Sequence, residues 1–395
     1  MKYGVGIDIS KGKSTIAILS IEGEVIKGPF EFYHSQKDLD NLDTLLNQYA
    51  KEDLKIIMEE TGTYHLPVLS YLIDKGYCVI AENAFRIKKY LDRGLRKAKT
   101  DKKDSLKLAE YACDNWYKLK MPIIEDSKYK DLRFLSRQYF AFNSIKVQQK
   151  VNFSNLTDML FPGYYKLLNE NNYVLGLKVF QKYSLETIKN KKLETFINEV
   201  NKMAQKIGHK RASITFAKKV YELANQSVSS CPYSEYTQLI IDNCVVALIQ
   251  SIETTKEIIS KMQEIANTLP EYETVKNMPG AGPRLAPLLI AEIGDIRKFK
   301  DSSSLIAYAG IDAPPYQSGQ FEATNRHISK RGNKYLRKTG YEVMKAIKSF
   351  YSVGNEFYDY MLKKESEGKK KKVAKIAALN KFLRQYYAKL AKLYN

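Results

Sequence analysis

The stretch Val5-Gly6-Ile7-Asp8-Ile9 has the pattern of a buried strand with a carboxylate at its centre. A charged side chain among apolar neighbours is costly unless something compensates its charge, and a bound cation does so well. A second apolar stretch, Ile56-Ile57-Met58-Glu59, also has its carboxylate at the carboxyl end of a predicted strand. Together the two stretches predict a sheet that carries acidic side chains, and they set the fold class of the N-terminal part.

Strand and helix patterns follow one another through residues 1–124. Strands are predicted at Tyr3–Ile9, Ser14–Ile21, Glu24–Tyr33, Leu54–Met58 and Tyr77–Ala81. Helices are predicted after the N-cap Ser35 as far as Leu46, then at Leu66–Lys75, Ala84–Leu91 and Asp101–Asp114. Three strands in a row, followed by alternating helices and strands, is the layer order of an α/β fold.

Length and charge bound the class of protein. The chain has 395 residues and a mass of 45.4 kDa, which suggests two or three domains and enough chain for a sizeable core. Its 64 Lys and Arg residues against 44 Asp and Glu residues give a net charge of +20 and a pI near 9.4. A basic surplus of this size points to a polyanionic partner, and a merely basic surface without such a partner is the alternative.

Cysteines and hydropathy exclude several further classes. The cysteines Cys78, Cys113, Cys231 and Cys244 are scattered, with no CxxC pair and no His at zinc-ligand spacing, so neither a disulfide framework nor a structural zinc site is expected. No stretch reaches about 18 apolar residues, and the strand pattern Lys2–Ile9 leaves no room for a signal peptide. We therefore expect a cytoplasmic protein without a membrane segment.

The rest of the chain is predicted to be mainly helical and to form two domains. After an N-terminal domain of residues 1–124, residues 125–272 form a highly charged helical connector and residues 273–395 a C-terminal domain. A heptad seam ends the connector, with steps of four and three along Ile241, Val245, Leu248, Ile252, Thr255, Ile259, Met262, Ala266 and Leu269. Such a seam fits an intermolecular coiled coil and bundle packing within one chain equally well.

Two further carboxylates complete a candidate metal site. Asp101 and Asp104 are three residues apart on a predicted helix and therefore lie on one face of it. With Asp8 and Glu59 they give four carboxylates on two strands and one helix, a ligand set that suits hard cations such as Mg²⁺. Taken singly, Asp101 and Asp104 are more often part of an N-terminal helix cap, and Glu59 a surface acid before a turn.

Two motifs in the C-terminal part suggest contacts to nucleic-acid phosphates. Pro279-Gly280-Ala281-Gly282 precedes an apolar helix and resembles helix-hairpin-helix modules, in which glycines such as Gly280 and Gly282 let backbone N–H groups approach a phosphate. A plain Gly-Pro turn is the alternative. A basic cluster mixes a loop with a helix start, as phosphate-binding elements often do, and consists of Lys330, Arg331, Lys334, Arg337 and Lys338.

Two single residues beside these motifs have more than one interpretation. His327 fits a general base, a phosphate donor or a packed residue. The dipeptide Ser318-Gly319 by itself predicts only a turn.

The position of Asp8 on the first strand of this strand order resembles the ribonuclease H-like fold of the RuvC type. Nucleases of that fold hold two metal ions that activate a nucleophile and stabilise the leaving group. Actin-like sugar kinases have a similar strand-loop-strand opening, and Gly6-Ile7-Asp8 suits them too. They would need a second phosphate-binding hairpin of the same type, and the sequence contains none.

Six short motifs lie in order along nearly the whole chain. They are Gly6-Ile7-Asp8, Glu59-Glu60-Thr61-Gly62, Lys99-Thr100-Asp101-Lys102-Lys103-Asp104, Met278-Pro279-Gly280-Ala281-Gly282, Gln317-Ser318-Gly319 and Lys330-Arg331-Gly332-Asn333. Together they resemble the DEDD-type transposases of bacterial insertion sequences, the IS110 group with its IS1111 relatives. Each motif is weak singly, and their common order gives the resemblance its weight.

The resemblance implies a RuvC-like catalytic domain, a helical coiled-coil connector and a mainly helical C-terminal transposase domain with a nucleophilic serine. Carried over by motif, the catalytic and metal-binding tetrad is Asp8, Glu59, Asp101 and Asp104, and the serine is Ser318. The family pattern Glu-x-Thr-Gly selects Glu59 over its neighbour. The resemblance also implies Mg²⁺ with Mn²⁺ as a substitute, donor and target DNA, a noncoding bridge RNA that pairs with both, and dimers or tetramers.

The expected function is therefore that of an RNA-guided DNA recombinase. In it, Ser318 attacks a scissile phosphate and a covalent phosphoserine link forms. One alternative is a RuvC-like junction nuclease that uses water as its nucleophile, with Ser318 in a plain turn. The other is a non-enzymatic RNA-binding scaffold, against which the four carboxylates argue. A covalent protein–DNA adduct would separate the recombinase from the nuclease.

Overall fold

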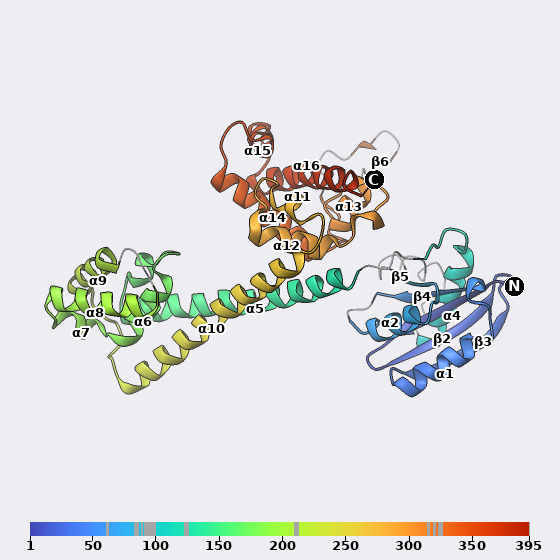
Figure 1. Ribbon diagram of the computed structural model, residues 1–395, viewed down its shortest axis with the longest axis horizontal. Coiled ribbons are helices and arrows are strands. Elements are labelled where there is room, and N and C mark those ends of the chain that lie inside the picture. Colours follow the sequence, from blue (N-terminus) through green and yellow to red (C-terminus); the bar gives the residue numbers. More distant parts are fainter. Residues whose placement is uncertain are drawn as a thin grey trace. The chain divides into compact units, whose positions relative to one another are not determined.

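The computed structural model of the protein (Figure 1) describes residues 1–60, 63–82, 87, 90, 100–121, 126–208, 213–313, 317–318, 321–322 and 327–394. The chain forms two compact units. The first comprises Met1–Ile124 and the segment Arg297–Lys300, and the second comprises Glu125–Ile296 and Asp301–Asn395. The three domains expected from the sequence, 1–124, 125–272 and 273–395, stay a prediction.

A mixed five-stranded sheet forms the centre of the first unit, with the strand order β3-β2-β1-β4-β5. The strands are β1 (Tyr3–Ile9), β2 (Lys13–Ser20), β3 (Val25–Tyr33), β4 (Leu54–Glu59) and β5 (Val79–Glu82). The first three form an antiparallel meander, and β4 and β5 run parallel to β1. This arrangement confirms the α/β class expected from the sequence and is consistent with a ribonuclease H-like fold. Strand β5 begins later than expected, because the Tyr77 N–H is bonded to the Leu72 carbonyl of the preceding helix.

Helices cover both faces of this sheet. On one face, α1 (Gln36–Leu46) and α2 (Leu66–Asp74) share one core with Val5 and Ile7 of β1. Their buried residues are Leu39, Leu42 and Leu46 of α1 and Val68 and Leu72 of α2. On the other face, α4 (Asp101–Asp114) contacts β1, β2 and β4. The short turn η1 (Lys51–Asp53) leads into β4. The helix expected at Ala84–Leu91 falls mainly outside the described residues.

Two long antiparallel helices, α5 (Ser127–Leu160) and α10 (Glu235–Ala266), form the axis of the second unit. They pack against each other in the middle of their length, where Lys146 Nζ donates a hydrogen bond to Thr255 Oγ1 at 3.0 Å. Each helix starts with a side-chain cap, Asp126 for α5 and Ser234 for α10. Local capping therefore determines where both helices begin.

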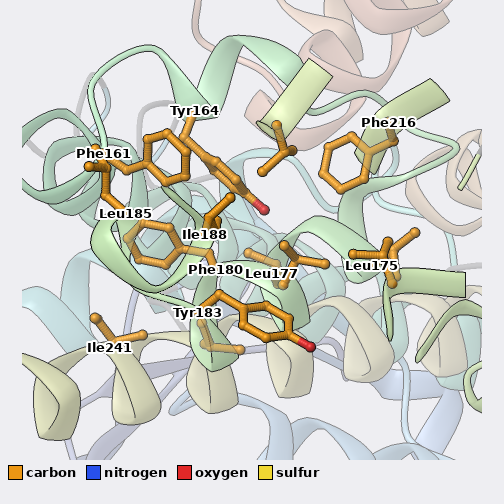
Figure 2. Close-up of a cluster of buried hydrophobic side chains, with 14 of the residues drawn as sticks. Phe161, Tyr164, Leu175, Leu177, Phe180, Tyr183, Leu185, Ile188, Phe216 and Ile241 are labelled. Carbon is orange, nitrogen blue, oxygen red and sulfur yellow. The ribbon is translucent and has the colours of Figure 1, made fainter. Parts of the chain in front are cut away.

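The chain between α5 and α10 folds into a helical lobe with its own core (Figure 1). Its elements are η2 (Tyr164–Leu167), α6 (Tyr173–Lys182), α7 (Leu185–Lys189), α8 (Leu193–Lys206) and α9 (Ser213–Gln226). Figure 2 shows aromatic rings at the centre of this core. The Tyr164 ring lies next to those of Phe161 and Phe180 in tilted arrangements, with ring centroids 5.0 and 5.3 Å apart.

The heptad seam expected on α10 is buried inside its own chain. Ile241, Val245 and Leu248 are at most 1% exposed and belong to the core of the helical lobe. Met262 and Ala266, further along the seam, are fully buried as well. The burial favours packing within one chain, and a coiled coil between chains stays unconfirmed.

Further helices complete the second unit. They are α11 (Tyr272–Lys276), α12 (Gly282–Ile293), α13 (Ser302–Ala309), α14 (Lys334–Phe350), α15 (Glu356–Ser366) and α16 (Lys371–Ala391). The short turn η3 (Ile296–Lys298) follows α12 and continues into the segment Arg297–Lys300 of the first unit. A two-stranded hairpin of β6 (Gln317–Ser318) and β7 (Phe321–Glu322) follows α13 along the chain. The C-terminal helix α16 contacts α11, α13, α14 and α15 and so holds this part together.

None of the described helices combines the length and the apolar character needed to cross a membrane. The four cysteines carry free thiols, and burial raises the pKa of the thiol of Cys78, Cys113 and Cys244. A raised pKa keeps a thiol protonated and unreactive near neutral pH.

Candidate active site

Three parallel strands end at one edge of the sheet, and each carries a carboxylate there. Because β1, β4 and β5 are parallel, their carboxyl ends meet at the same edge. In the register of β1 and β4, Ile7 lies opposite Met58, so the next residues, Asp8 and Glu59, are neighbours at this edge. Two residues expected to be catalytic from the sequence are thus brought together by strand pairing.

Contacts between β1 and α4 show which face of the sheet Asp8 occupies. Side chains alternate along a strand, so Gly4, Gly6 and Asp8 lie on one face. A Cβ added at Gly4 would lie 2.6 Å from the Ala109 carbonyl oxygen, and one added at Gly6 would lie 2.1 Å from the Ser105 carbonyl oxygen. Each two-residue step along β1 therefore moves the contact about one turn back along α4. One further step brings Asp8 to the first turn of α4.

Strand β4 leads Glu59 to the same region. Ile57 packs against Leu108 of α4, and Lys55, two residues earlier, donates a hydrogen bond to the Leu119 carbonyl at 2.6 Å. Glu59 is two residues after Ile57 and therefore lies on the same face. Both strands thus run along α4 toward its N-terminus, with their carboxylates at the end.

Asp101 and Asp104 lie in that first turn of α4. Thr100 caps the turn, because its hydroxyl accepts a backbone N–H at 3.3 Å. Asp104 is only 8% exposed, whereas Asp101 is exposed. The pKa of Lys13 is raised chiefly by its hydrogen bond and ion pair with Glu31, and the negative charge of Asp101 adds to this effect. The partial positive charge of the helix N-terminus stabilises both carboxylates. The four acids expected from the sequence therefore gather at one edge and one face of the sheet, and their catalytic role stays a prediction.

The structure adds a fifth carboxylate, Glu82, that the sequence patterns did not single out. Glu82 ends β5 directly opposite Glu59 in the parallel register, so both side chains lie on the face of α4. The Tyr111 hydroxyl of α4 donates a hydrogen bond to Glu82 Oε2 at 3.3 Å. The sequence pattern that indicated Glu59, an acid at the end of an apolar run, is also present at Glu82. It was missed because the strand predicted there, Tyr77–Ala81, ends one residue before Glu82.

The donor set at this edge fits a hard divalent cation in its chemistry. All the side chains gathered there are carboxylates, the oxygen ligands that Mg²⁺ and Mn²⁺ prefer. Among the residues described here, no three Asp, Glu, His or Cys side chains lie close enough together to hold a metal ion. That Asp8, Glu59, Asp101 and Asp104 hold such a cation therefore stays a prediction.

Ser318 lies in the second unit, in the hairpin that β6 forms with β7. It pairs with Phe321 across this hairpin, and its side chain is outside what the structure describes. The chain on either side of the hairpin is held together by backbone hydrogen bonds. The Ser329 N–H donates to the Asp312 carbonyl at 2.8 Å, and the Lys330 N–H to the Gly310 carbonyl at 3.0 Å. These bonds join the described residues that precede and follow the hairpin in the sequence.

The basic cluster expected to bind phosphate divides into exposed cations and a structural arginine. Lys330, Arg331 and Lys334 are exposed, and Lys330 adopts a left-handed conformation with φ of 55°. Arg337 instead donates from Nη1 to the carbonyls of Ala309 and Gly332, both at 2.9 Å, and burial lowers its pKa. The nucleic-acid contacts predicted for Lys330, Arg331, Lys334 and Arg337 stay a prediction. The geometry gives Arg337 a role in holding two loops together.

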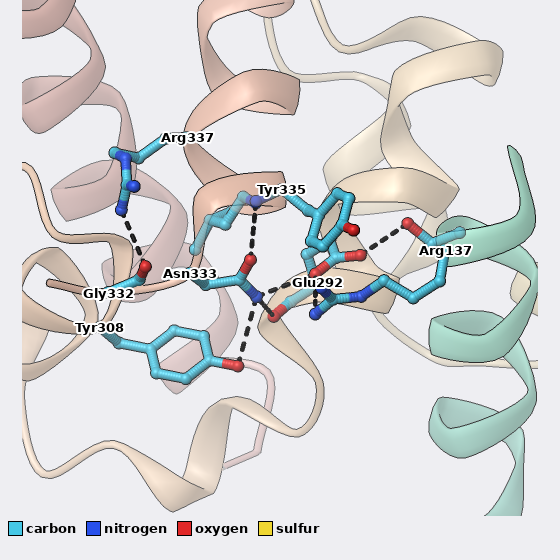
Figure 3. A network of polar contacts seen from close by, with 9 residues as sticks. Arg137, Glu292, Tyr308, Gly332, Asn333, Tyr335 and Arg337 are labelled. Carbon is cyan, nitrogen blue, oxygen red and sulfur yellow. Dashed lines mark hydrogen bonds and ion pairs between the residues drawn. The ribbon is translucent and has the colours of Figure 1, made fainter. Parts of the chain in front are cut away.

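A buried polar network explains the last residue of this motif, Asn333 (Figure 3). Glu292 of α12 is fully buried and accepts hydrogen bonds from Ser136 at 2.7 Å, Arg137 at 2.9 Å and Asn333 at 2.8 Å. The side-chain oxygen Oδ1 of Asn333 caps α14 by accepting the N–H of Tyr335 at 2.9 Å. One network thus joins α5, α12 and the start of α14.

The two glycines of the hairpin-like motif differ in their surroundings. At Gly280, with φ of +76°, an added Cβ would lie 2.6 Å from Ile347 and 2.8 Å from the Val343 carbonyl oxygen, so this glycine lets the turn pack on α14. At Gly282, with φ of +55°, an added Cβ would meet nothing within 4 Å. The contact of Gly280 and Gly282 with a nucleic-acid phosphate stays a prediction.

Comparisons with known proteins match both parts of the chain. A family model for the DEDD transposase of IS110, described as transposase, matches residues 5–162, which include the four acids. A second model, described as transposase of the IS116/IS110/IS902 family, matches residues 272–359, which include Ser318 and the basic cluster. The two matches together cover more than half of the chain.

Individual relatives share parts of the sequence. A 44.8 kDa protein of insertion element IS116 from Streptomyces clavuligerus is 30% identical over 158 residues, which is 40% of this chain and 39% of that protein. The transposase of insertion sequence element IS1111A from Coxiella burnetii is 30% identical over 147 residues, 36% of this chain and 38% of that protein. A pilin gene-inverting protein of Moraxella bovis is 30% identical over 129 residues, 32% of this chain and 39% of that protein. The chain thus spans only 38–39% of the length of these relatives.

Proposed function

Since this chain belongs to the IS110 family of transposases, we propose that it is the DNA recombinase of an insertion sequence, guided to its sites by a noncoding RNA. One observation carries the proposal. Asp8, Glu59 and Asp104 come from two strands and one helix, yet they share one edge and one face of the sheet. Carboxylates at one edge of a sheet could hold a divalent cation, and such a cation would assist phosphoryl transfer.

The proposed reaction uses Ser318 as the nucleophile. Its Oγ attacks the phosphorus of a scissile phosphodiester, a P–O bond to the serine forms, and the P–O bond to the sugar oxygen breaks. The serine loses its proton, and the departing oxygen gains one and leaves as a free hydroxyl. When bound, a divalent cation at the carboxylates would polarise the phosphate oxygens. The phosphoserine ester conserves the energy of the phosphodiester, so the reverse attack rejoins DNA without ATP.

Charge supports nucleic acid as the partner. The chain carries a net charge of +20, and the helical lobe between Gly163 and Tyr233 contributes twelve Lys and Arg residues against five Asp and Glu residues. A surplus of this size binds DNA and RNA through their phosphates. We assign the guide-RNA role by resemblance to the family, in which the serine of one protomer acts with the carboxylates of another, so the smallest active assembly is a dimer.

The serine is tested by trapping the covalent intermediate. Purified protein is incubated with donor DNA, guide RNA and Mg²⁺, and protein–DNA adducts are resolved on a denaturing gel. Ser318→Ala should abolish both the adduct and strand cleavage, because only the attacking hydroxyl is removed. Ser303→Ala, at an exposed position in the first turn of α13, is the matched control and should retain both.

Two outcomes would contradict parts of this proposal. Robust cleavage by Ser318→Ala with a free 5′-phosphate on the product would make water the nucleophile, as in a RuvC-like junction nuclease. Recombination that proceeds equally well without the element's own RNA would remove the guide and leave a DNA-only recombinase. A gene flanked by an untranslated region that folds with two internal loops, matching the element ends and the target, would support RNA guidance.

A further inference from the structure

A pocket of about 260 Å³ lies where α5, α10 and α12 meet in the second unit. Helix α5 contributes Tyr139 and Lys146, α10 contributes Lys256 and Gln263, and α12 contributes Arg284. The three helices contact one another pairwise, so the walls of the pocket are held by ordinary helix packing. The pocket belongs to a different unit from the carboxylate edge.

Three cations line this pocket, namely Lys146, Lys256 and Arg284. Within the part of the chain that the structure describes, none of them forms an ion pair with a carboxylate. Lys146 is half-buried and bonds to the Thr255 hydroxyl at 3.0 Å. Burial lowers its pKa, and the neighbouring Lys150, Arg284 and Lys256 lower it further. Positive charge is therefore concentrated here, on cations that pair with no carboxylate among the described residues.

One acid acts on the pocket from outside. Burial raises the pKa of Tyr139, and Glu342 raises it further, whereas Arg284 lowers it through its charge and a hydrogen bond. Glu342 is itself paired with Lys345 at 3.1 Å. Like charges held together disfavour their charged forms, and an anion bound between them would remove that penalty.

The start of α12 adds a further attraction for an anion. Gln263 of α10 donates a hydrogen bond to the Pro283 carbonyl at 2.9 Å, which holds the first turn of α12 beside the pocket. The space next to Gly282 is open, as an added Cβ would meet nothing within 4 Å. A helix N-terminus presents unpaired N–H groups and a partial positive charge, which adds to the three cations.

We infer that this pocket binds one phosphate group of a nucleic-acid backbone. Lysine and arginine contacts of this kind position DNA or RNA without reading its sequence. The inference deepens the proposed function and rests on it for the source of the phosphate, which is the DNA or RNA of the recombination complex. Free inorganic phosphate shares the same chemistry, and the experiment below separates these sources.

Salt-dependent binding tests the pocket in the full-length chain. The probes are a fluorescent DNA duplex and a fluorescent RNA hairpin. Lys256→Gln and Arg284→Gln should each weaken binding to at least one probe, whatever its sequence, and reduce the log–log salt slope by about one, because one phosphate contact is lost. Lys261→Gln is the matched control on α10. It removes the same charge from a lysine paired with Glu264 outside the pocket, and it should leave affinity and slope unchanged.

Lysine acetylation, read by mass spectrometry, locates the contact independently of affinity. Bound nucleic acid should protect Lys146 and Lys256 several-fold, while Lys261 stays reactive. The RNA and DNA probes are compared separately, and the probe that protects identifies the source of the phosphate. Inorganic phosphate alone is the third probe and should protect only weakly, because it lacks the other contacts that a nucleic acid makes.

Two results would overturn the inference. In the first, the unaltered chain binds the probes, but the pocket variants behave like Lys261→Gln and no protection of Lys146 is seen. The pocket is then an ordinary basic hollow, and the proposed function is untouched. In the second, inorganic phosphate protects Lys146 and neither nucleic acid does, so the pocket takes a free anion. If the unaltered chain binds neither DNA nor RNA, the proposed function fails, and this inference fails with it.

Discussion

Gly6 sets how closely α4 approaches β1, two residues before Asp8. Gly6→Ala would place a Cβ 2.1 Å from the Ser105 carbonyl oxygen and 2.3 Å from the Ala109 nitrogen. Both are backbone atoms that cannot rotate away, so α4 must shift. We expect the free energy of unfolding to fall by about 1–3 kcal/mol, as in overpacked cores. Urea denaturation followed by the fluorescence of Trp116 measures it, since this single tryptophan is buried in the first unit.

A second glycine provides the control for this substitution. Gly28 lies in β3, where an added Cβ meets nothing within 4 Å and the backbone is not left-handed. Gly28→Ala should therefore change the free energy of unfolding by no more than about 0.5 kcal/mol. Equal stability of the Gly6→Ala and Gly28→Ala proteins would mean that α4 is not docked on β1 as described.

Asp104 tests the metal-binding role of the carboxylates. Asp104→Asn should abolish strand cleavage in Mg²⁺, because a neutral amide replaces a charged ligand. Excess Mn²⁺, which binds the same ligands more strongly, should restore part of the activity. The Ser318→Ala protein should not respond to Mn²⁺, since it lacks the nucleophile and not the metal. A gel-based cleavage assay with both metals measures these differences.

A neighbouring acid on the same helix controls for loss of charge alone. Glu110 is exposed on α4, away from its first turn, and Glu110→Gln should cleave DNA normally in Mg²⁺. Full activity of Asp104→Asn in Mg²⁺ would remove Asp104 from the metal site. Cleavage by the unaltered protein in the presence of a chelator would remove the metal from the reaction.

At the scale of elements, α10 uses its heptad seam for packing inside its own chain. Leu248 is fully buried in the core of the helical lobe, so Leu248→Glu places an uncompensated charge there. We expect a loss of about 3–5 kcal/mol in the free energy of unfolding, as for other unpaired buried charges. Circular dichroism during thermal unfolding measures the loss, and light scattering reports the oligomeric state.

Val246 gives the matched substitution on the opposite side of α10. Its side chain is 58% exposed, so Val246→Glu should leave the thermal midpoint nearly unchanged. If Leu248→Glu instead stays folded with unchanged stability and only changes the oligomeric state, the seam joins two chains. That result would restore the intermolecular coiled coil as the function of the seam.

At the scale of the whole molecule, the net charge of +20 predicts a steep salt dependence of nucleic-acid binding. A complex that neutralises roughly 6–10 phosphates should lose about 10³–10⁵ in affinity between about 50 and 200 mM salt. Fluorescence anisotropy with DNA and RNA probes measures the slope. A log–log slope shallower than about −2 would mean that the basic surplus is not a nucleic-acid surface.

The sequence by itself determined the local features of this protein. The strands β1 and β4, the carboxylates Asp8 and Glu59 on them, and the helix from Asp101 to Asp114 all follow from patterns that act within a few residues. The family resemblance is also a property of the sequence, because each motif that carries it is a short run of residues. These features need no information about distant contacts, because alternation, capping and turn formation are local properties of the backbone.

The tertiary structure alone decided which of these features meet. The Glu82 side chain joins the candidate site only through the parallel register of β4 and β5, and Asn333 acquires its role only through the buried Glu292. The seam around Leu248 indicated a buried face, but periodicity reports that a residue is buried and not what covers it. The cations that line the pocket, Lys146, Lys256 and Arg284, likewise come from three different helices. Long-range packing sets such contacts, and no local pattern encodes the partner.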